Sequence, residues 1–176
     1  MNLAQLFFLK MINKEKMKAT KEQEAFMQEA IRLALDNIKT GNGGPFGAVI
    51  VKNGIIIGRG SNSVTSENDP TAHAEVMAIR EACKNLSNFQ LDGCELYTSC
   101  EPCPMCLGAI YWARPSRVYF AATREMAAEA GFDDSYIYNQ IPLQPHERDI
   151  PTNHLKLDDA FTVFDEWVLS EKKIPY

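Results

Sequence analysis

Two short motifs constrain this chain more than any other feature of its sequence. The first is the triplet His73-Ala74-Glu75, and the second is the run Pro102-Cys103-Pro104-Met105-Cys106. A catalytic zinc ion takes three protein ligands, with His and Cys among the preferred donors, and leaves its fourth position to water. Cys103 and Cys106 are spaced to share one face of a helix, and a helix N-terminus favours the thiolate that metal binding requires. The sequence therefore predicts one catalytic Zn²⁺ per chain, held by His73, Cys103 and Cys106.

Glu75 lies beside the predicted ligands without being one of them. Hydrolytic chemistry at such a site needs a group that takes a proton from the attacking water and returns protons to the departing group. A His-x-Glu pair alone is common in unrelated helices. When Pro-Cys-x-x-Cys follows it, the combination has the signature of zinc deaminases that act on nucleobases. We therefore predict that Glu75 is the catalytic proton shuttle.

Two other kinds of metal site fit part of the cysteine pattern. Cys100, Cys103 and Cys106 follow the opening of an iron–sulfur run, but the further cysteine and proline of that run do not follow. A structural zinc site would recruit Cys100 as a fourth protein ligand. That arrangement leaves Glu75 without a role, so the catalytic site is the favoured interpretation.

Length and charge limit the classes of function. The chain has 176 residues and is 45% hydrophobic, which suits one globular domain. Its net charge of -5 gives an average surface field that repels phosphate, and no strong basic patch offsets that field. No stretch approaches the ~18 apolar residues that span a bilayer. We therefore expect neither a nucleic acid nor a membrane as a partner.

The two ends of the chain and its cysteines suggest domain limits and a compartment. Residues 1–20 contain a lysine-rich stretch and lack the pattern of a secretory signal, so we expect a flexible N-terminal extension there. Residues 21–176 are expected to form a single zinc deaminase domain. Five cysteines, three of them clustered, suit metal chemistry in a reducing compartment better than a disulfide framework. We expect a cytoplasmic protein.

Apolar spacing and turn residues predict alternating helices and strands. An amphipathic helix is expected over 22–39, followed by strands over 47–51 and 55–60 that Asn53-Gly54 joins as a hairpin. Asp69-Pro70 predicts the start of a helix that carries His73 and Glu75 in its first turn. The remaining expected elements are a strand over 95–99, a helix from Pro102 or Pro104, a parallel strand over 117–122 and a closing helix over 157–172.

The residues around both motifs resemble those of a known enzyme family. Asp69-Pro70-Thr71-Ala72-His73-Ala74-Glu75 and Cys100-Glu101-Pro102-Cys103 resemble segments of purine deaminases and tRNA adenosine deaminases. The chain is similar to bacterial guanine deaminases also through Gly43-Gly44-Pro45-Phe46-Gly47, Gly108-Ala109-Ile110-Tyr111-Trp112-Ala113 and Ala130-Gly131-Phe132-Asp133-Asp134-Ser135. The resemblance implies an α/β protein with a three-layer α/β/α cytidine-deaminase-like fold and a five-stranded mixed sheet. It also implies a homodimer whose C-terminal segments can exchange between subunits.

The same resemblance implies a set of substrate contacts. Asn62 would bind the edge of a purine, Phe46 and Trp112 would flank its ring, and Ala74 would lie at the substrate. Asp134 would be a second catalytic carboxylate that comes from the partner subunit, and Tyr176 would cover the substrate as a lid. Without the resemblance, Asn62 reads equally well as a turn residue, Phe46 and Trp112 as core, Asp133-Asp134 as a helix cap and the C-terminus as a frayed tail.

The implied reaction is the zinc-dependent hydrolytic deamination of guanine to xanthine and ammonia. Guanosine deamination and tRNA adenosine deamination are the alternatives. An editor of tRNA needs Lys and Arg beside the site for phosphate contacts. The expected closing helix instead carries the acidic residues Asp158, Asp159, Asp165 and Glu166. A free, small-molecule purine is therefore the favoured substrate.

Overall fold

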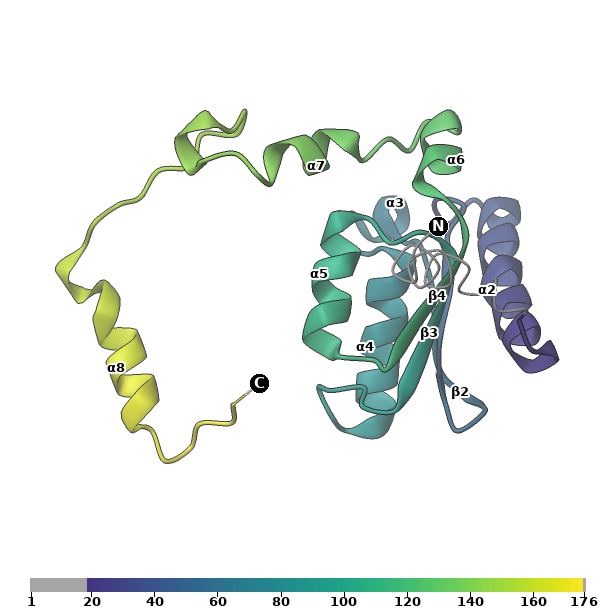
Figure 1. Ribbon diagram of the computed structural model, residues 1–176, viewed down its shortest axis with the longest axis horizontal. Helices are drawn as coiled ribbons and strands as arrows, with labels where there is room; N and C mark the ends of the chain where they lie inside the picture. The colour runs from purple at the N-terminus through teal and green to yellow at the C-terminus, as the bar shows by residue number, and fades with distance from the viewer. Residues whose placement is uncertain (1–18, 176) are drawn as a thin grey trace, which may run out of the picture.

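A mixed β-sheet forms the centre of the protein (Figure 1). The structure is a computed structural model, and it describes residues 19–175. The extension predicted over residues 1–20 thus lies outside the described residues except for its last two. The strands follow in the spatial order β2 (Ile55–Ser61), β1 (Gly47–Lys52), β3 (Cys94–Cys100) and β4 (Arg117–Ala122). β1 is antiparallel to β2 and β3, and β3 and β4 are parallel, as the sequence predicts.

The central strand β1 supplies side chains to the cores on both faces of the sheet. The covering helices are α2 (Lys21–Thr40), α4 (Ala74–Leu86) and α5 (Pro104–Ala113). Ala48 and Ile50 pack with residues of α4 and α5, whereas Val49 and Val51 pack with residues of α2. Successive side chains of a strand point to opposite faces, so one strand serves both cores. Figure 1 shows α2 on one side of the sheet and α4 and α5 on the other, which confirms the three-layer prediction.

Local signals account for the first helix and the hairpin. Thr20 forms a capping box with Gln23 at the start of α2, and Gly41 ends the helix with a φ of 70°. Asn53 and Gly54 have φ values of 51° and 74°, which a two-residue type I′ turn requires. Both elements lie within one residue of their predicted bounds.

The helix that carries Glu75 starts later than the sequence predicts. Asp69 does not cap α4: its Oδ1 accepts hydrogen bonds from the backbone N–H and the hydroxyl of Thr71, at 2.8 and 2.7 Å. This local turn uses the carboxylate that we expected at the helix start. His73 is the N-cap of α4, with extended backbone at φ -74° and ψ 153°. Glu75 remains in the first turn, as predicted.

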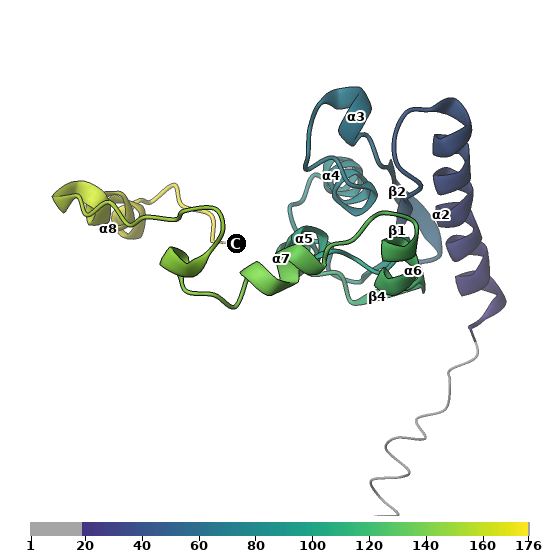
Figure 2. The ribbon, with the colours of Figure 1, turned by 90° about the horizontal axis from the view of Figure 1, so that it is seen from above.

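The described residues form four strands, not the five that the resemblance implies. After β4, Thr123 caps α6 (Arg124–Glu129) through a hydrogen bond from Met126 N, so the chain enters a helix and does not return to the sheet edge. α7 (Ser135–Gln140) follows, and residues 144–175, hereafter the C-terminal arm, extend away from the sheet in both views (Figures 1 and 2). Within residues 19–175, β4 is therefore an edge strand.

The C-terminal arm contains only short helices. They are η1 (Pro145–Glu147), η2 (Asp158–Phe161) and α8 (Thr162–Leu169). The closing helix predicted over 157–172 is thus shorter, because its first turn is 3-10 and Ser170 leaves the helical conformation. Among residues 19–175, no helix combines the length and the apolar character needed to cross a membrane.

Candidate metal centre and catalytic pocket

The N-termini of α4 and α5 bring the three predicted ligands together. His73 is the N-cap of α4, Cys103 is the N-cap of α5, and Cys106 lies in the first turn of α5. The Nδ1 atom of His73 is 3.6 Å from Sγ of Cys103 and 3.4 Å from Sγ of Cys106. Ligand lengths at a tetrahedral zinc ion place nitrogen and sulfur donors about 3.5 Å apart. Within residues 19–175, this trio is the group of donors close enough to hold a metal ion, and it fits zinc.

The pKa values of the two cysteines are shifted in opposite directions. A hydrogen bond from the Cys106 thiol, together with His73, lowers the pKa of Cys103 to about 4. The same hydrogen bond and burial raise the pKa of Cys106. The hydrogen bond with Cys103 also raises the pKa of His73. Cys103 is therefore ready as a thiolate ligand, and the remaining thiol proton is the one that metal binding displaces.

Glu75 lies beside the donors with the properties of an acid–base group. Its side chain is only 6% exposed, and its Oε2 accepts a hydrogen bond from the Cys106 thiol at 3.4 Å. Burial raises the pKa of Glu75. A raised pKa strengthens the carboxylate as a base, which suits a group that takes a proton from water and passes it on.

A cavity of about 650 Å³ opens onto the metal donors. Its lining includes His73, Cys103 and Glu75, and two of the predicted substrate contacts, Phe46 and Asn62. A volume of this size is typical of small-molecule sites.

Asp134 of the same chain also lines this cavity, so this pocket does not need the partner subunit to supply that carboxylate. Burial and the nearby Cys103 raise the pKa of Asp134. Its neighbour Asp133 accepts a hydrogen bond from Ser135 N at 2.9 Å, which lowers the pKa of Asp133. Asp133 thus forms the local turn bond at the start of α7, and Asp134 faces the cavity.

Two of the predicted substrate residues lie elsewhere. Ala74 is fully buried in the core between α4 and the sheet. Trp112 is 64% exposed and lines a second cavity, of about 530 Å³, to which Phe89 and Ile174 also contribute. Tyr176 lies outside the described residues. Within one chain, therefore, the structure does not bring Trp112 to the catalytic cavity.

Sequence reasoning missed several residues of the cavity. Phe132 packs its edge against the ring of Phe46, with centroids 4.9 Å apart and planes at 84°. Arg124, at the start of α6, also lines the cavity. Phe132 stands in a segment that carries the family resemblance, so that segment was the available signal, whereas Arg124 belongs to no motif.

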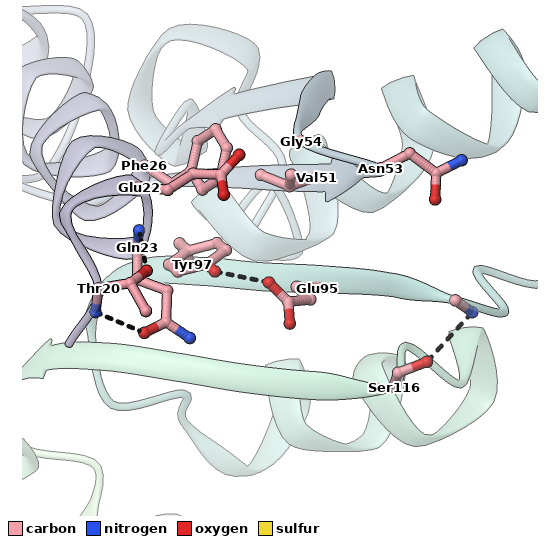
Figure 3. Close-up of a pocket in the computed structure, with 11 residues that line it drawn as sticks. Thr20, Glu22, Gln23, Phe26, Val51, Asn53, Gly54, Glu95, Tyr97 and Ser116 are labelled. Atoms are coloured by element: carbon pink, nitrogen blue, oxygen red, sulfur yellow. Dashed lines mark hydrogen bonds between the residues drawn. The ribbon is translucent and has the colours of Figure 1, made fainter. Parts of the chain in front are cut away.

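A third cavity, of about 410 Å³, shares no residue with the catalytic one (Figure 3). It lies beside the first turn of α2 and the first half of β3. Its polar groups bond to one another: the Tyr97 hydroxyl donates to Glu95 at 2.6 Å, and Gly93 N donates to Ser116 Oγ at 3.1 Å. This cavity adds nothing to the metal centre.

The fold and the His-Cys-Cys centre together define a zinc-dependent deaminase. The family described as "Cytidine and deoxycytidylate deaminase zinc-binding region" matches residues 20–122, which is more than half of the chain. The chain therefore belongs to this family, and the predicted fold class and zinc cofactor are confirmed.

The comparisons with individual proteins agree. The chain is 59% identical to a guanine deaminase of Bacillus subtilis over 144 residues, which cover 82% of this chain and 92% of that protein. The X-ray structure of guanine deaminase from Bacillus subtilis superposes with a TM-score of 0.86 at 57% identity and covers 87% of this chain and 98% of that one. A tRNA-specific adenosine deaminase of Aquifex aeolicus is 47% identical over 100 residues, covering 57% of this chain and 66% of that protein. The resemblance inferred from the sequence is confirmed.

Proposed function

We propose that the protein hydrolyses guanine to xanthine and ammonia. One observation carries the proposal: a buried carboxyl, Glu75, lies against three zinc donors in a cavity that also holds Phe46 and Asn62. The similarity to guanine deaminase over most of both chains supports guanine as the substrate.

The chain's own residues supply proton transfer and orientation. Zinc, when bound, supplies Lewis-acid activation of the attacking water. Glu75 takes a proton from that water and delivers protons to the ring and to the departing amine. Its burial keeps bulk water away from the transferred protons. The balance is one purine and one water consumed, and one xanthine and one ammonia formed.

Asp134 is proposed as the second carboxylate of the reaction. It lines the cavity with Glu75, and burial together with the nearby Cys103 raises its pKa, which makes it a better proton acceptor. Phe46, braced by Phe132, offers an aromatic face to the flat base, and Asn62 offers an amide to the purine edge.

Charge around the cavity favours a free base over tRNA. The charged side chains on the cavity wall include Glu101, Asp133 and Asp134 against Arg124. Binding of a polynucleotide requires Lys and Arg groups that neutralise phosphates. An acidic wall opposes that contact, whereas it does not affect a neutral purine.

The C-terminal arm supports a homodimer with exchanged segments. Its exposed apolar side chains include Ile150, Leu155, Phe161, Phe164 and Leu169. A monomer rarely leaves so large an apolar surface in water, and exchange of an identical segment buries it without new sequence. In such a dimer, Trp112 and Tyr176 would act at the partner's cavity, with Tyr176 as the aromatic lid. The five unpaired cysteines support a reducing, cytoplasmic location.

Ammonia release tests the proposal. The purified protein is incubated with guanine, guanosine, adenine, cytosine, cytidine and a tRNA that carries the editable adenosine. We expect ammonia from guanine above all others. Faster release from guanosine, or release from tRNA that falls steeply with salt, would replace guanine with the corresponding alternative.

A further inference from the structure

A buried amide on α2 holds two backbone segments that border the catalytic cavity. Asn37 lies near the end of α2 and is only 6% exposed. Its Nδ2 donates to the carbonyl oxygens of Gly44 and Asn62, both at 2.8 Å. One side chain thus joins the loop before β1 to the residue that follows β2.

The loop is built to allow this close approach. A Cβ atom on Gly43 would lie 2.0 Å from the carbonyl oxygen of Asn62 and 3.1 Å from Nδ2 of Asn37. Any side chain at position 43 would therefore separate the two segments. A Cβ atom on Gly44 would lie 3.3 Å from the ring of Phe46, so the same loop also supports one wall of the cavity.

The backbone that Asn37 holds at Gly44 and Asn62 determines how the side-chain amide of Asn62 is oriented. Oδ1 of Asn62 accepts hydrogen bonds from Gly44 N at 3.1 Å and from Val64 N at 3.4 Å. Backbone N–H groups can only donate, so they fix the oxygen on their side of the amide. Among the described residues, no hydrogen bond engages Nδ2 of Asn62, whose side chain is 7% exposed and lines the cavity. Asn62 therefore presents an N–H donor to the ligand, which suits a carbonyl oxygen or an unprotonated ring nitrogen.

We propose that Asn37 is a positioning residue, which fixes the Asn62 amide as a donor toward the purine. The proposal rests on the proposed deamination of a purine base. Asn37 does not line the cavity, so it acts through Gly44 and Asn62 and not on the substrate. Without it, the carbonyls of Gly44 and Asn62 lose a shared donor, and the Gly44 N–H can move away from Oδ1 of Asn62.

A double-mutant cycle separates positioning from general stability. We expect Asn37→Ala to lower kcat/KM for guanine by about tenfold or more, the usual effect of a lost buried hydrogen bond. In an Asn62→Ala background, the same change should alter kcat/KM by less than about twofold, because coupled residues are not additive. Equal losses in both backgrounds would show that Asn37 acts on the fold alone. Asn37→Asp, which keeps the side-chain volume but exchanges the donor for an acceptor, serves if Asn37→Ala does not fold.

Asn85 provides the matched control. Its Nδ2 also donates to a backbone carbonyl, that of Ile57, at 2.8 Å, but away from the catalytic cavity. Asn85→Ala should leave kcat/KM unchanged. Zinc content should be the same in Asn37→Ala, in Asn62→Ala, in the variant that combines them and in Asn85→Ala.

A readout without substrate keeps this inference distinct from the proposed function. Hydrogen exchange of the Gly44 amide should become about tenfold faster in Asn37→Ala and stay unchanged in Asn85→Ala. Unchanged exchange in Asn37→Ala would overturn the role of Asn37. If the wild-type protein releases no ammonia from guanine, the proposed function fails, and the exchange measurement still decides whether Asn37 orients Asn62.

Discussion

At the scale of single residues, the metal centre separates binding from proton transfer. Cys106 is connected to both functions, because its sulfur is a predicted metal ligand and its thiol donates a hydrogen bond to Glu75. Glu75 is buried beside the donor trio but is not one of its members. Substitutions at these two positions should therefore have different consequences for the metal.

Glu75→Gln should keep zinc and the fold while activity falls at least ~10²-fold, because the amide cannot carry the proton. Cys106→Ala should lose zinc and activity together, because it removes a ligand. Elemental analysis and ammonia release measure both outcomes. A Glu75→Gln enzyme with near-normal turnover would remove the proton-shuttle role, and full zinc in Cys106→Ala would remove the ligand.

Residues that the reaction itself requires were predictable from the sequence. Residues that act through contacts with distant parts of the chain were not. His73, Glu75 and Cys103 follow from the requirements of zinc and proton transfer, so their spacing is readable. Asn37 lies in a helix without any motif, and its function depends on a loop and a strand end that meet it in space. Trp112 lines a different cavity from the one that the resemblance implies, and no local signal in the sequence indicates this placement.

At the scale of elements, two glycines in β2 let α4 pack closely on the sheet. A Cβ atom on Gly60 would lie 2.0 Å from the carbonyl oxygen of Ala74, and one on Gly58 would lie 2.4 Å from that of Ala78. This contact fixes the start of α4, which carries His73 and Glu75. The hairpin and the parallel pairing of β3 with β4 were predictable from local signals. The N-cap of α4 was not, because Asp69 bonds to Thr71, and the number of strands depends on where the chain goes after β4.

Gly60→Ala should therefore weaken the metal centre as well as the fold. We expect a loss of about 1–3 kcal/mol in the free energy of unfolding, because the added methyl group overpacks the strand–helix contact. Zinc affinity should fall too, since His73 adjoins the displaced turn. Gly108→Ala in α5 is the control, because its Cβ would meet no atom within 4 Å beyond the neighbouring backbone of its own helix. Chemical unfolding and zinc competition measure both variants; equal zinc affinity in Gly60→Ala and wild type would contradict this account.

An ion-pair network links α2 to β2 and makes stability depend on pH. Glu29 accepts from Arg32 at 2.7 Å and from Arg59 of β2 at 3.2 Å. The pKa of Glu29 is lowered from 4.5 to about 2, mainly by the hydrogen bond from Arg32. A lowered pKa in the folded state stabilises the protein above the unfolded value and loses that effect as pH falls toward the folded value.

We therefore expect Glu29→Gln to be less stable than wild type at pH 6 and closer to it at pH 3. Urea unfolding of both proteins at each pH gives the difference. A gap that does not narrow on acidification would show that the carboxylate contributes by packing and not by charge.

At the scale of the whole molecule, the C-terminal arm and the edge strand β4 both leave surface exposed that a second chain could cover. Phe120 of β4 is 47% exposed, and the arm carries apolar residues far from the sheet (Figure 2). An exposed edge strand is a site where another chain can pair. We expect light scattering to show a dimer for the full chain.

Ending the chain after Pro151 should shift the protein toward monomer and lower kcat/KM for guanine. Zinc should be retained, because the metal donors all precede β4.

Removing only Pro175 and Tyr176 should keep the dimer and raise KM if Tyr176 is the lid. Unchanged kinetics in the shorter deletion would remove Tyr176 from the site, and an unchanged mass in the longer one would exclude the arm from the interface.

An exchanged arm would also make the two subunits genetically complementary. One subunit with Glu75→Gln has an intact arm and an inactive cavity, while a subunit that ends at Pro151 has an intact cavity and no arm. Co-refolded, the pair should regain activity that neither possesses alone, because the arm of the first covers the cavity of the second. A cell that carries two defective copies of this gene could then still deaminate its substrate.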